Sequence, residues 1–399
     1  MAKGRREIPP SCKTYGFPIY CAAWAPLPHL SPTPTEGEEE EEKEEEAGEQ
    51  GEEPCLIAVL GGGGGEGHSG IPNVLLLSRF DVPALSLSDQ PVSKIVTDDD
   101  VPYRMAVHPR GDGVICAFPK DCRWFVWNFP HKKVHKLALK SSEQKLTKLE
   151  GVGLQLALVF NAEGSILAAG GEDGHLRIFK WPSMEIILHE TDVHATVKDL
   201  AFSFDAKFLL SLGNSGPCKV WDLTSSKIAA SLSREDGEVF GFCKFSQHTD
   251  STQLLYITAM HGDYGKIIIW NTDSWKRIST KKIIRDAISA FNVSTDGKLL
   301  AIGTVEGDVL ILNSSNMGVQ MRVRKAHLGI VTAVVFSQDS RFLISASFDS
   351  TARVIPVESK TKRGLNVWLI IFVILVAIMA YYYINRKEVL KGWGIDDAE

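Results

Sequence analysis

The chain has 399 residues and a formal net charge of −6. Twelve Glu and one Lys fall within residues 36–53, so this segment carries a net charge of −11 and the rest of the chain is mildly basic at +5. The Lys and Arg residues form no field interleaved with aromatic residues, which excludes the usual pattern of a nucleic-acid-binding surface. The seven cysteines are odd in number and contain no C-x-x-C pair, which favours reduced thiols in the cytosol over a zinc site or a disulfide framework.

The first residues carry Lys3, Arg5 and Arg6, but prolines follow at once and no apolar stretch of a secretory signal peptide is present. The acidic segment at residues 36–53 is flanked by prolines and shows no apolar periodicity. We therefore expect it to be a disordered, solvated insert within the first folded unit.

A glycine-rich stretch at residues 61–73 lies between two strand-like runs, residues 55–60 and 74–80. Glycine adopts positive φ without steric cost, so this backbone can turn almost anywhere. Because it has few side chains to pack, it offers mainly bare peptide groups, which can line an ion or a partner surface.

Three interpretations of this stretch compete. The glycines match the dinucleotide pattern G-x-G-x-x-G at Gly62, Gly64 and Gly67, but that fingerprint needs a helix next, whereas Pro72 and a β-type run follow. A phosphate loop of the Walker type needs a lysine, and the stretch has none. A flexible hairpin loop without a role stays open, but the closing Pro72-Asn73 pair favours a loop of defined shape.

A unit of about 43 residues then repeats along the chain. Each copy contains an alternating apolar strand, a turn rich in Ser, Asn or Asp, a second strand, a Gly/Asp turn and a third strand. Its apolar anchors fall 42 to 48 residues apart, at Phe160, Phe202, Phe245, Val293 and Phe336. Two upstream stretches, residues 20–26 and 105–112, fit the same template and bring the count to seven. This period predicts an all-β, seven-bladed WD40-like propeller over residues 1–357.

The last unit shows only three strands, ending near residues 353–355. We expect the N-terminal segment at residues 11–15 to supply the fourth strand and to close the ring. His194 and His327 precede blade starts and are expected to be turn residues rather than ligands. The sequence contains no recognisable nucleophile context, so an enzyme is not expected.

Residues 367–384 are 18 uncharged, mostly apolar residues with aromatic residues at both ends. As a helix they would extend about 27 Å, so we expect one transmembrane helix. Residues 358–366 would link it to the propeller. Basic residues are equal on its two sides, but because no signal peptide precedes it, we expect a cytosolic propeller and a short lumenal tail at residues 385–399.

The propeller, the C-terminal apolar segment and the glycine loop in the first unit together resemble a known family. This is the Sec-twelve family, also called the prolactin regulatory element-binding protein family, of guanine-nucleotide exchange factors resident in the endoplasmic reticulum (ER) membrane. The resemblance implies activation of a Sar-type small GTPase, which starts COPII coat assembly and ER-to-Golgi transport.

The resemblance also implies site residues. The loop would bind a potassium ion through backbone carbonyls, with the candidate ligands Gly63, Gly64, Gly65, Gly67, Gly70 and Ile71. Asn73, Asp100 and Pro102 would contact the GTPase and serve exchange. Exchange needs no covalent chemistry and no small-molecule substrate. The alternative is an exchange-inactive relative that acts as a cargo-exit or scaffold factor at the ER membrane, and the intact loop with Asn73 favours the first interpretation.

Overall fold

The computed structural model describes residues 9–27, 55–67, 69–129, 136–247, 253–357 and 371–382. The chain divides into two units after Val357. The expected acidic insert, the linker and the tail lie outside the described residues, so those predictions stay predictions.

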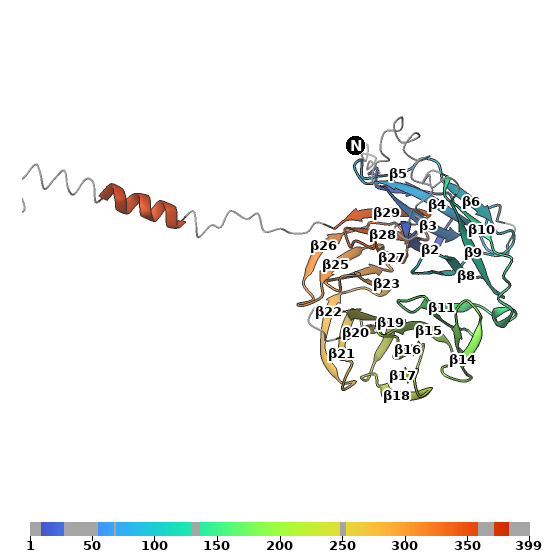
Figure 1. Ribbon diagram of the computed structural model, residues 1–399. Coiled ribbons are helices and arrows are strands. Elements are labelled where there is room, and N and C mark those ends of the chain that lie inside the picture. The colour runs from blue at the N-terminus through green and yellow to red at the C-terminus, as the bar shows by residue number, and fades with distance from the viewer. Residues whose placement is uncertain are drawn as a thin grey trace, which may run out of the picture. The chain divides into compact units, whose positions relative to one another are not determined.

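The first unit consists of seven antiparallel sheets arranged in a ring, as the sequence predicts (Figure 1). The first sheet contains β2 (Ile19–Trp24), β3 (Cys55–Gly62), β4 (Val74–Asp81), β5 (Ser86–Leu87) and β6 (Ser93–Val96). The second contains β7 (Arg104–Val107), β8 (Gly113–Ala117), β9 (Cys122–Asn128) and β10 (Ala138–Ser141), and a 3-10 helix, η3 (Thr147–Leu149), follows it.

The remaining sheets follow in chain order. The third contains β11 (Gln155–Phe160), β12 (Ile166–Gly171), β13 (Leu176–Lys180) and β14 (Glu185–Glu190). The fourth contains β15 (Val197–Phe202), β16 (Phe208–Gly213), β17 (Cys218–Asp222) and β18 (Lys227–Leu232). The fifth contains β19 (Glu238–Gln247), β20 (Gln253–His261), β21 (Tyr264–Asn271) and β22 (Arg277–Ile284). The sixth contains β23 (Ile288–Val293), β24 (Leu299–Thr304), β25 (Val309–Asn313) and β26 (Val319–Val323). The seventh contains β27 (Val331–Phe336), β28 (Phe342–Ser347), β29 (Thr351–Pro356) and β1 (Cys12–Thr14).

The repeat anchors all lie at or near the ends of inner strands. Phe160, Phe202, Val293 and Phe336 are the last residues of β11, β15, β23 and β27, and Phe245 lies near the end of β19. Each core cluster draws apolar residues from neighbouring sheets. The repeat period therefore predicts the blades correctly, because one apolar position per blade packs against the preceding blade.

The N-terminal strand closes the ring, as expected. β1 pairs antiparallel with β29, and the Tyr15 N–H donates to the Ser350 carbonyl at 2.9 Å. First and last blades share a core in which Phe80 lies 5.3 Å from Phe342 between ring centroids. The Trp24 indole N–H donates to the Val335 carbonyl at 3.0 Å. Both ends of the first unit thus belong to one blade, and β1 covers the outer edge of β29.

Six of the seven inner strands contain a β-bulge near their first residues; β7 shows none. A bulge inserts one extra residue that opposes none on the partner strand, and this re-aims its side chain. We call the bulge residues that have no partner on the neighbouring strand skipped residues; they include Tyr20, Leu156, Lys198, Ser289 and Thr332.

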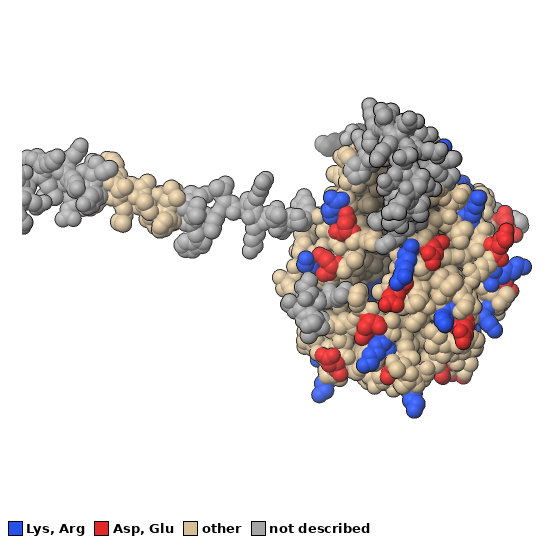
Figure 2. Space-filling view, in the orientation of Figure 1, with Lys and Arg blue, Asp and Glu red and all other residues tan. Residues whose placement is uncertain are grey.

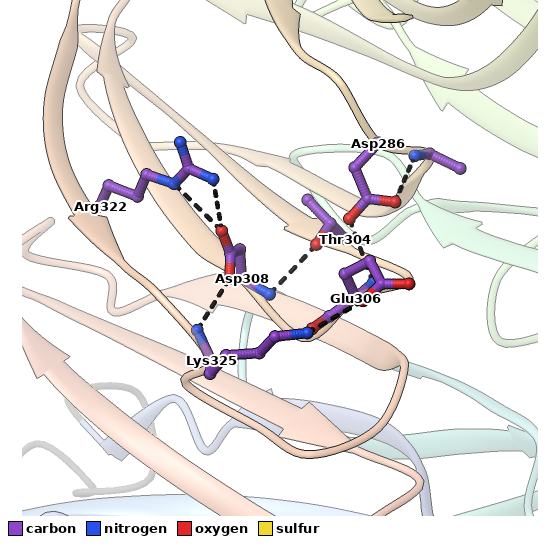
Figure 3. A network of polar contacts seen from close by, with 7 residues as sticks. Asp286, Thr304, Glu306, Asp308, Arg322 and Lys325 are labelled. Carbon is purple, nitrogen blue, oxygen red and sulfur yellow. Dashed lines mark hydrogen bonds and ion pairs between the residues drawn. The ribbon is translucent and has the colours of Figure 1, made fainter. Parts of the chain in front are cut away.

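A polar network fixes the turn between β24 and β25 (Figure 3). The Asp308 carboxylate accepts hydrogen bonds from the Arg322 guanidinium at 2.7 and 3.0 Å and from the Lys325 N–H at 2.7 Å. The Asp308 N–H donates to the Thr304 hydroxyl at 3.1 Å, and the Lys325 ammonium pairs with Glu306 at 2.9 Å. The turn between β24 and β25 joins the second and third strands of its blade, and the glycine loop joins β3 and β4, the second and third strands of the first blade. The two connections therefore lie at the same end of the ring.

The second unit contains a helix at residues 371–382. Among the described residues, no helix combines the length and the apolarity that crossing a bilayer requires. The expected span at residues 367–384 extends beyond the described helix at both ends, so the transmembrane assignment stays a prediction.

Candidate functional site

The glycine loop leaves the first blade at Gly62, the last residue of β3, and returns at Val74, the first residue of β4. Gly63 and Asn73 are buried at its base, whereas the described residues from Glu66 to Pro72 are exposed. The loop therefore has an anchored base and a tip that a partner can reach.

Asn73, a residue that is 3% exposed, closes the loop with its side-chain amide. Its Oδ1 accepts the Gly65 N–H at 3.0 Å, and its Nδ2 donates to the Gly65 carbonyl at 3.2 Å. The same Nδ2 also donates to the Asp98 carbonyl at 2.9 Å. One side chain thus satisfies both backbone groups of a loop glycine and ties the loop to a turn 25 residues further along the chain.

The turn at residues 97–100 is fixed in its own right. The Thr97 N–H donates to the Asn73 carbonyl at 2.9 Å, and the Thr97 hydroxyl donates to the Asp100 carbonyl at 2.6 Å. The Asp100 carboxylate accepts a hydrogen bond from the guanidinium of Arg123 on β9. The brace therefore runs from the loop through Asn73 and Asp100 to the second blade.

Pro102 packs under the base of the loop. A Cβ added to Gly61 would lie 3.2 Å from Pro102 Cγ and 2.8 Å from Cys21 Sγ, so only glycine fits here. The Cys21 thiol donates to the Pro102 carbonyl with Sγ and O 3.4 Å apart. Burial raises the pKa of this thiol to about 12, so it stays protonated and acts as a small packing group.

Several backbone carbonyls of the loop have no hydrogen-bond partner among the described residues. The Gly65 carbonyl accepts from Asn73 and the Gly67 carbonyl accepts from the Ser69 N–H, while those of Gly63, Gly64, Gly70 and Ile71 accept no hydrogen bond from any other described residue. A Cβ on Gly64 would lie 2.1 Å from Ser69 Oγ and 2.9 Å from the Ile71 carbonyl oxygen, so the two sides of the loop lie against each other. Closely spaced carbonyl oxygens are the ligand type that potassium takes in proteins.

An aromatic cluster beside the loop was missed by the sequence analysis. The Tyr20 ring lies 5.0 Å from both the Tyr103 ring and the Phe348 ring, centroid to centroid, in edge-on contacts. Phe348 is 41% exposed, and Leu328, in the loop before β27, is 93% exposed. Apolar residues in the turns of a propeller are a signal that could have been read from the repeat alignment.

The structure brings Asn73, Asp100 and Pro102 together at the base of the loop. None is presented at the exposed tip: Asn73 and Pro102 are buried, and Asp100 binds Arg123. These positions make them positioning residues for the loop. Their predicted contact with a GTPase stays a prediction.

A family profile described as "WD domain, G-beta repeat" matches residues 145–180 and 318–355. The chain is 48% identical over 362 residues to "SEC12-like protein 2" of Arabidopsis thaliana, which covers 90% of this chain and 91% of that relative. It is 26% identical to "Guanine nucleotide-exchange factor SEC12" of Rattus norvegicus over 60% of this chain and 63% of the relative. It is 22% identical to the protein of the same name from Candida glabrata over 84% of this chain and 77% of the relative.

Proposed function

The chain belongs to the family of SEC12-like proteins, and from this premise we propose that it is a guanine-nucleotide exchange factor for a Sar-type small GTPase. The relatives from Rattus norvegicus and Candida glabrata carry the exchange-factor name. The single observation that carries the proposal is the glycine loop, which Asn73 holds closed while its tip stays exposed.

An exchange factor works by differential binding. It must bind the nucleotide-free GTPase more tightly than the nucleotide-bound form, and this difference sets how far it promotes release. A GTPase holds its nucleotide through switch segments, a phosphate loop and Mg²⁺. A loop that keeps its shape can push against a switch segment, whereas a loop that yields cannot. The brace from Asn73 to the 97–100 turn supplies that stiffness, and the aromatic cluster supplies apolar area for docking beside it.

We infer further that a potassium ion is held by carbonyl oxygens of the loop. The carbonyls of Gly63, Gly64, Gly70 and Ile71 would be ligands, and those of Gly65 and Gly67 can still contribute because a carbonyl oxygen has two lone pairs. When bound, the ion supplies a positive charge that draws the two sides of the loop together. The chain's own part is to bring these oxygens close and to keep side chains away from them.

The proposed location is the ER membrane, where the activated GTPase would start COPII coat assembly. The apolar run at residues 367–384 would anchor the chain there with the propeller in the cytosol. Alkaline carbonate extraction of microsomes tests the anchor. The full chain should stay in the pellet, and a chain ending at Val357 should be released; release of both would contradict the anchor.

The exchange assay measures release of a fluorescent GDP analogue from a purified Sar GTPase in potassium buffer, with residues 1–363, which contain all seven blades. We expect wild-type protein to accelerate release. Asn73→Ala should lower the acceleration by roughly tenfold to a hundredfold, because the three side-chain hydrogen bonds of Asn73 are lost. Asn271→Ala is the matched control, since Asn271 caps a turn of another blade through the N–H groups of Asp273 and Ser274.

Three outcomes matter. Acceleration that depends on Asn73 and not on Asn271 supports the proposal. No acceleration by wild-type protein contradicts it. Binding of the GTPase without acceleration would instead support the scaffold alternative.

A further inference from the structure

The seven inner strands surround a central channel that contains a cavity of about 180 Å³. The space-filling view shows the visible face of the ring hollowed near its middle, with Lys and Arg interspersed among Asp and Glu over the surrounding surface (Figure 2). The cavity is distinct from the glycine loop, and it shares Tyr20 with the aromatic cluster beside that loop.

The β-bulges determine which side chains line this cavity. Tyr20, Leu156, Lys198 and Thr332 are skipped residues in the bulges of β2, β11, β15 and β27, and all four line it. A bulge re-aims the extra residue out of the regular alternation of the strand. Lys198 is therefore presented to the channel by the backbone of its strand and not by a chance rotamer of a surface lysine.

The lining carries more positive than negative charge. Arg104, Lys198 and Lys244 are its three cations, and Asp199 is its one carboxylate. Asp199 is already engaged: its Oδ2 accepts the Cys243 N–H at 2.8 Å, and its Oδ1 lies 4.0 Å from the Lys244 ammonium. Two cations, Arg104 and Lys198, therefore have no carboxylate of their own among the described residues.

Both of these cations are half-buried, and neither uses all of its hydrogen-bond donors among the described residues. Arg104 donates from Nε to the Leu156 carbonyl at 3.1 Å and from Nη1 to the Tyr103 carbonyl at 3.4 Å, which leaves Nη2 without a partner among the described residues. The Lys198 ammonium lies over the Phe242 ring, whose centroid is 5.7 Å away. Burial lowers the pKa of Lys198; Asp199 opposes this effect, and Arg234 and Arg104 add to it. An anion between Arg104 and Lys198 would offset the repulsion between their two positive charges.

We propose that the central channel is a binding site for a phosphate group, either as inorganic phosphate or as the phosphate of a small monoester. Two cations without a carboxylate match its double negative charge. Asn292 and Tyr20 also line the cavity, and their side chains carry an amide N–H₂ and a hydroxyl that can donate hydrogen bonds. A volume of about 180 Å³ is roughly six times the share of one water molecule in the liquid, which leaves room for a phosphate group with a small substituent.

The test is isothermal titration calorimetry on the full chain in detergent micelles, with sodium phosphate, glycerol 3-phosphate and, as a control of equal ionic strength, sodium chloride. We expect saturable binding at one site per chain for at least one phosphate compound and none for chloride. Binding of inorganic phosphate alone would identify the free ion as the ligand, and tighter binding of glycerol 3-phosphate would identify a monoester. No saturable binding of either compound overturns the proposal.

Lys198→Met should weaken phosphate binding by about tenfold or more, because it removes one charge-assisted contact and keeps the length of the side chain. Lys207→Met is the matched control, since Lys207 is exposed on the next turn of the same blade and likewise lies over a ring, 5.3 Å from the Phe208 centroid. Equal affinity of the Lys198→Met variant and wild-type protein would overturn the proposal.

Thermal unfolding separates loss of binding from loss of fold. Phosphate should raise the unfolding temperature of wild-type protein and of Lys207→Met but not of Lys198→Met. Without phosphate, Lys198→Met should unfold at the wild-type temperature or above it, because an unpaired, half-buried charge has been removed. Lys198→Arg, which keeps the charge, should retain binding; if it binds no better than Lys198→Met, the proposal fails.

Discussion

Glu238, the first residue of β19, has a carboxylate that is fully buried and ionised. It accepts hydrogen bonds from the Arg277 guanidinium at 2.8 and 3.1 Å and from the Glu235 N–H at 3.0 Å, and it lies 3.4 Å from the Lys266 ammonium. Burial by itself raises the pKa of Glu238, but Arg277, the Glu235 N–H and Lys266 together lower it from an ordinary value near 4.5 to about 2. The carboxylate therefore holds two cations of different strands in one blade.

Replacing Glu238 by Gln should destabilise the protein by roughly 3–5 kcal/mol, because it leaves Arg277 and Lys266 without their buried partner. Glu235→Gln is the control: Glu235 also pairs with Arg277, at 2.8 Å, but its side chain is 60% exposed, so the loss should be under about 1 kcal/mol. Chemical denaturation of both variants at pH 7 measures the difference. Equal losses would contradict the assignment of the stabilisation to the buried carboxylate.

The same carboxylate predicts a pH dependence. Because the folded-state pKa is lower than the unfolded-state value, its contribution to stability is complete above about pH 4.5 and is lost as the pH falls toward about 2. The wild-type free energy of unfolding should therefore fall more steeply over this window than that of Glu238→Gln. Parallel curves for the two proteins would show that Glu238 is not the group responsible.

At the scale of the element, the glycine loop contains positions that tolerate a side chain and positions that do not. A Cβ on Gly64 would meet Ser69 Oγ at 2.1 Å, whereas a Cβ on Gly67 meets nothing within 4 Å. Gly64→Ala must therefore spread the two sides of the loop, and Gly67→Ala need not.

We expect Gly64→Ala to lower stimulated nucleotide release by at least about tenfold, since a displacement of about 1 Å in a positioning element can cost far more. Gly67→Ala should stay close to wild type, and both variants should unfold at similar temperatures, because the tip contributes little to the core. The release assay under Proposed function applies to both. Similar release by the two variants would show that the closed shape of the loop is not what exchange requires.

Features that depend on contacts between residues close in the sequence could be predicted, whereas those that depend on distant residues could not. The inner strands were predictable because one apolar anchor per blade repeats at a nearly constant spacing. The role of Asn73 was not, because its partner Asp98 lies 25 residues away and is reached only through the fold. The position of Lys198 in the channel was not predictable, because a regular strand places alternate side chains on opposite faces. The bulge between Val197 and Asp199 adds one residue and breaks this alternation.

At the scale of the whole molecule, the ring depends on a strand of only three residues. β1 completes the last blade by pairing with β29, and Val354 donates its N–H to the Ser11 carbonyl at 2.8 Å. Tyr15, just after β1, donates its hydroxyl to Ser78 in the first blade at 2.7 Å. Burial is the main reason that the pKa of Tyr15 rises to about 12, so this phenol stays a donor over the physiological range. The two blades at the seam are thus held together by the N-terminal segment.

Removing residues 1–15 should destabilise the ring by several kcal/mol, since it deletes a strand, unpairs the edge of β29 and removes the half-buried Tyr15 ring. An exposed edge strand also templates pairing with other chains, so the shortened protein should associate at concentrations at which the full chain does not. Thermal unfolding and size-exclusion chromatography measure the two effects. A chain lacking only residues 1–8 keeps β1 and is the control, expected to match the full chain in both. If the chain without residues 1–15 also matches it, the blade contacts alone close the ring and β1 is dispensable.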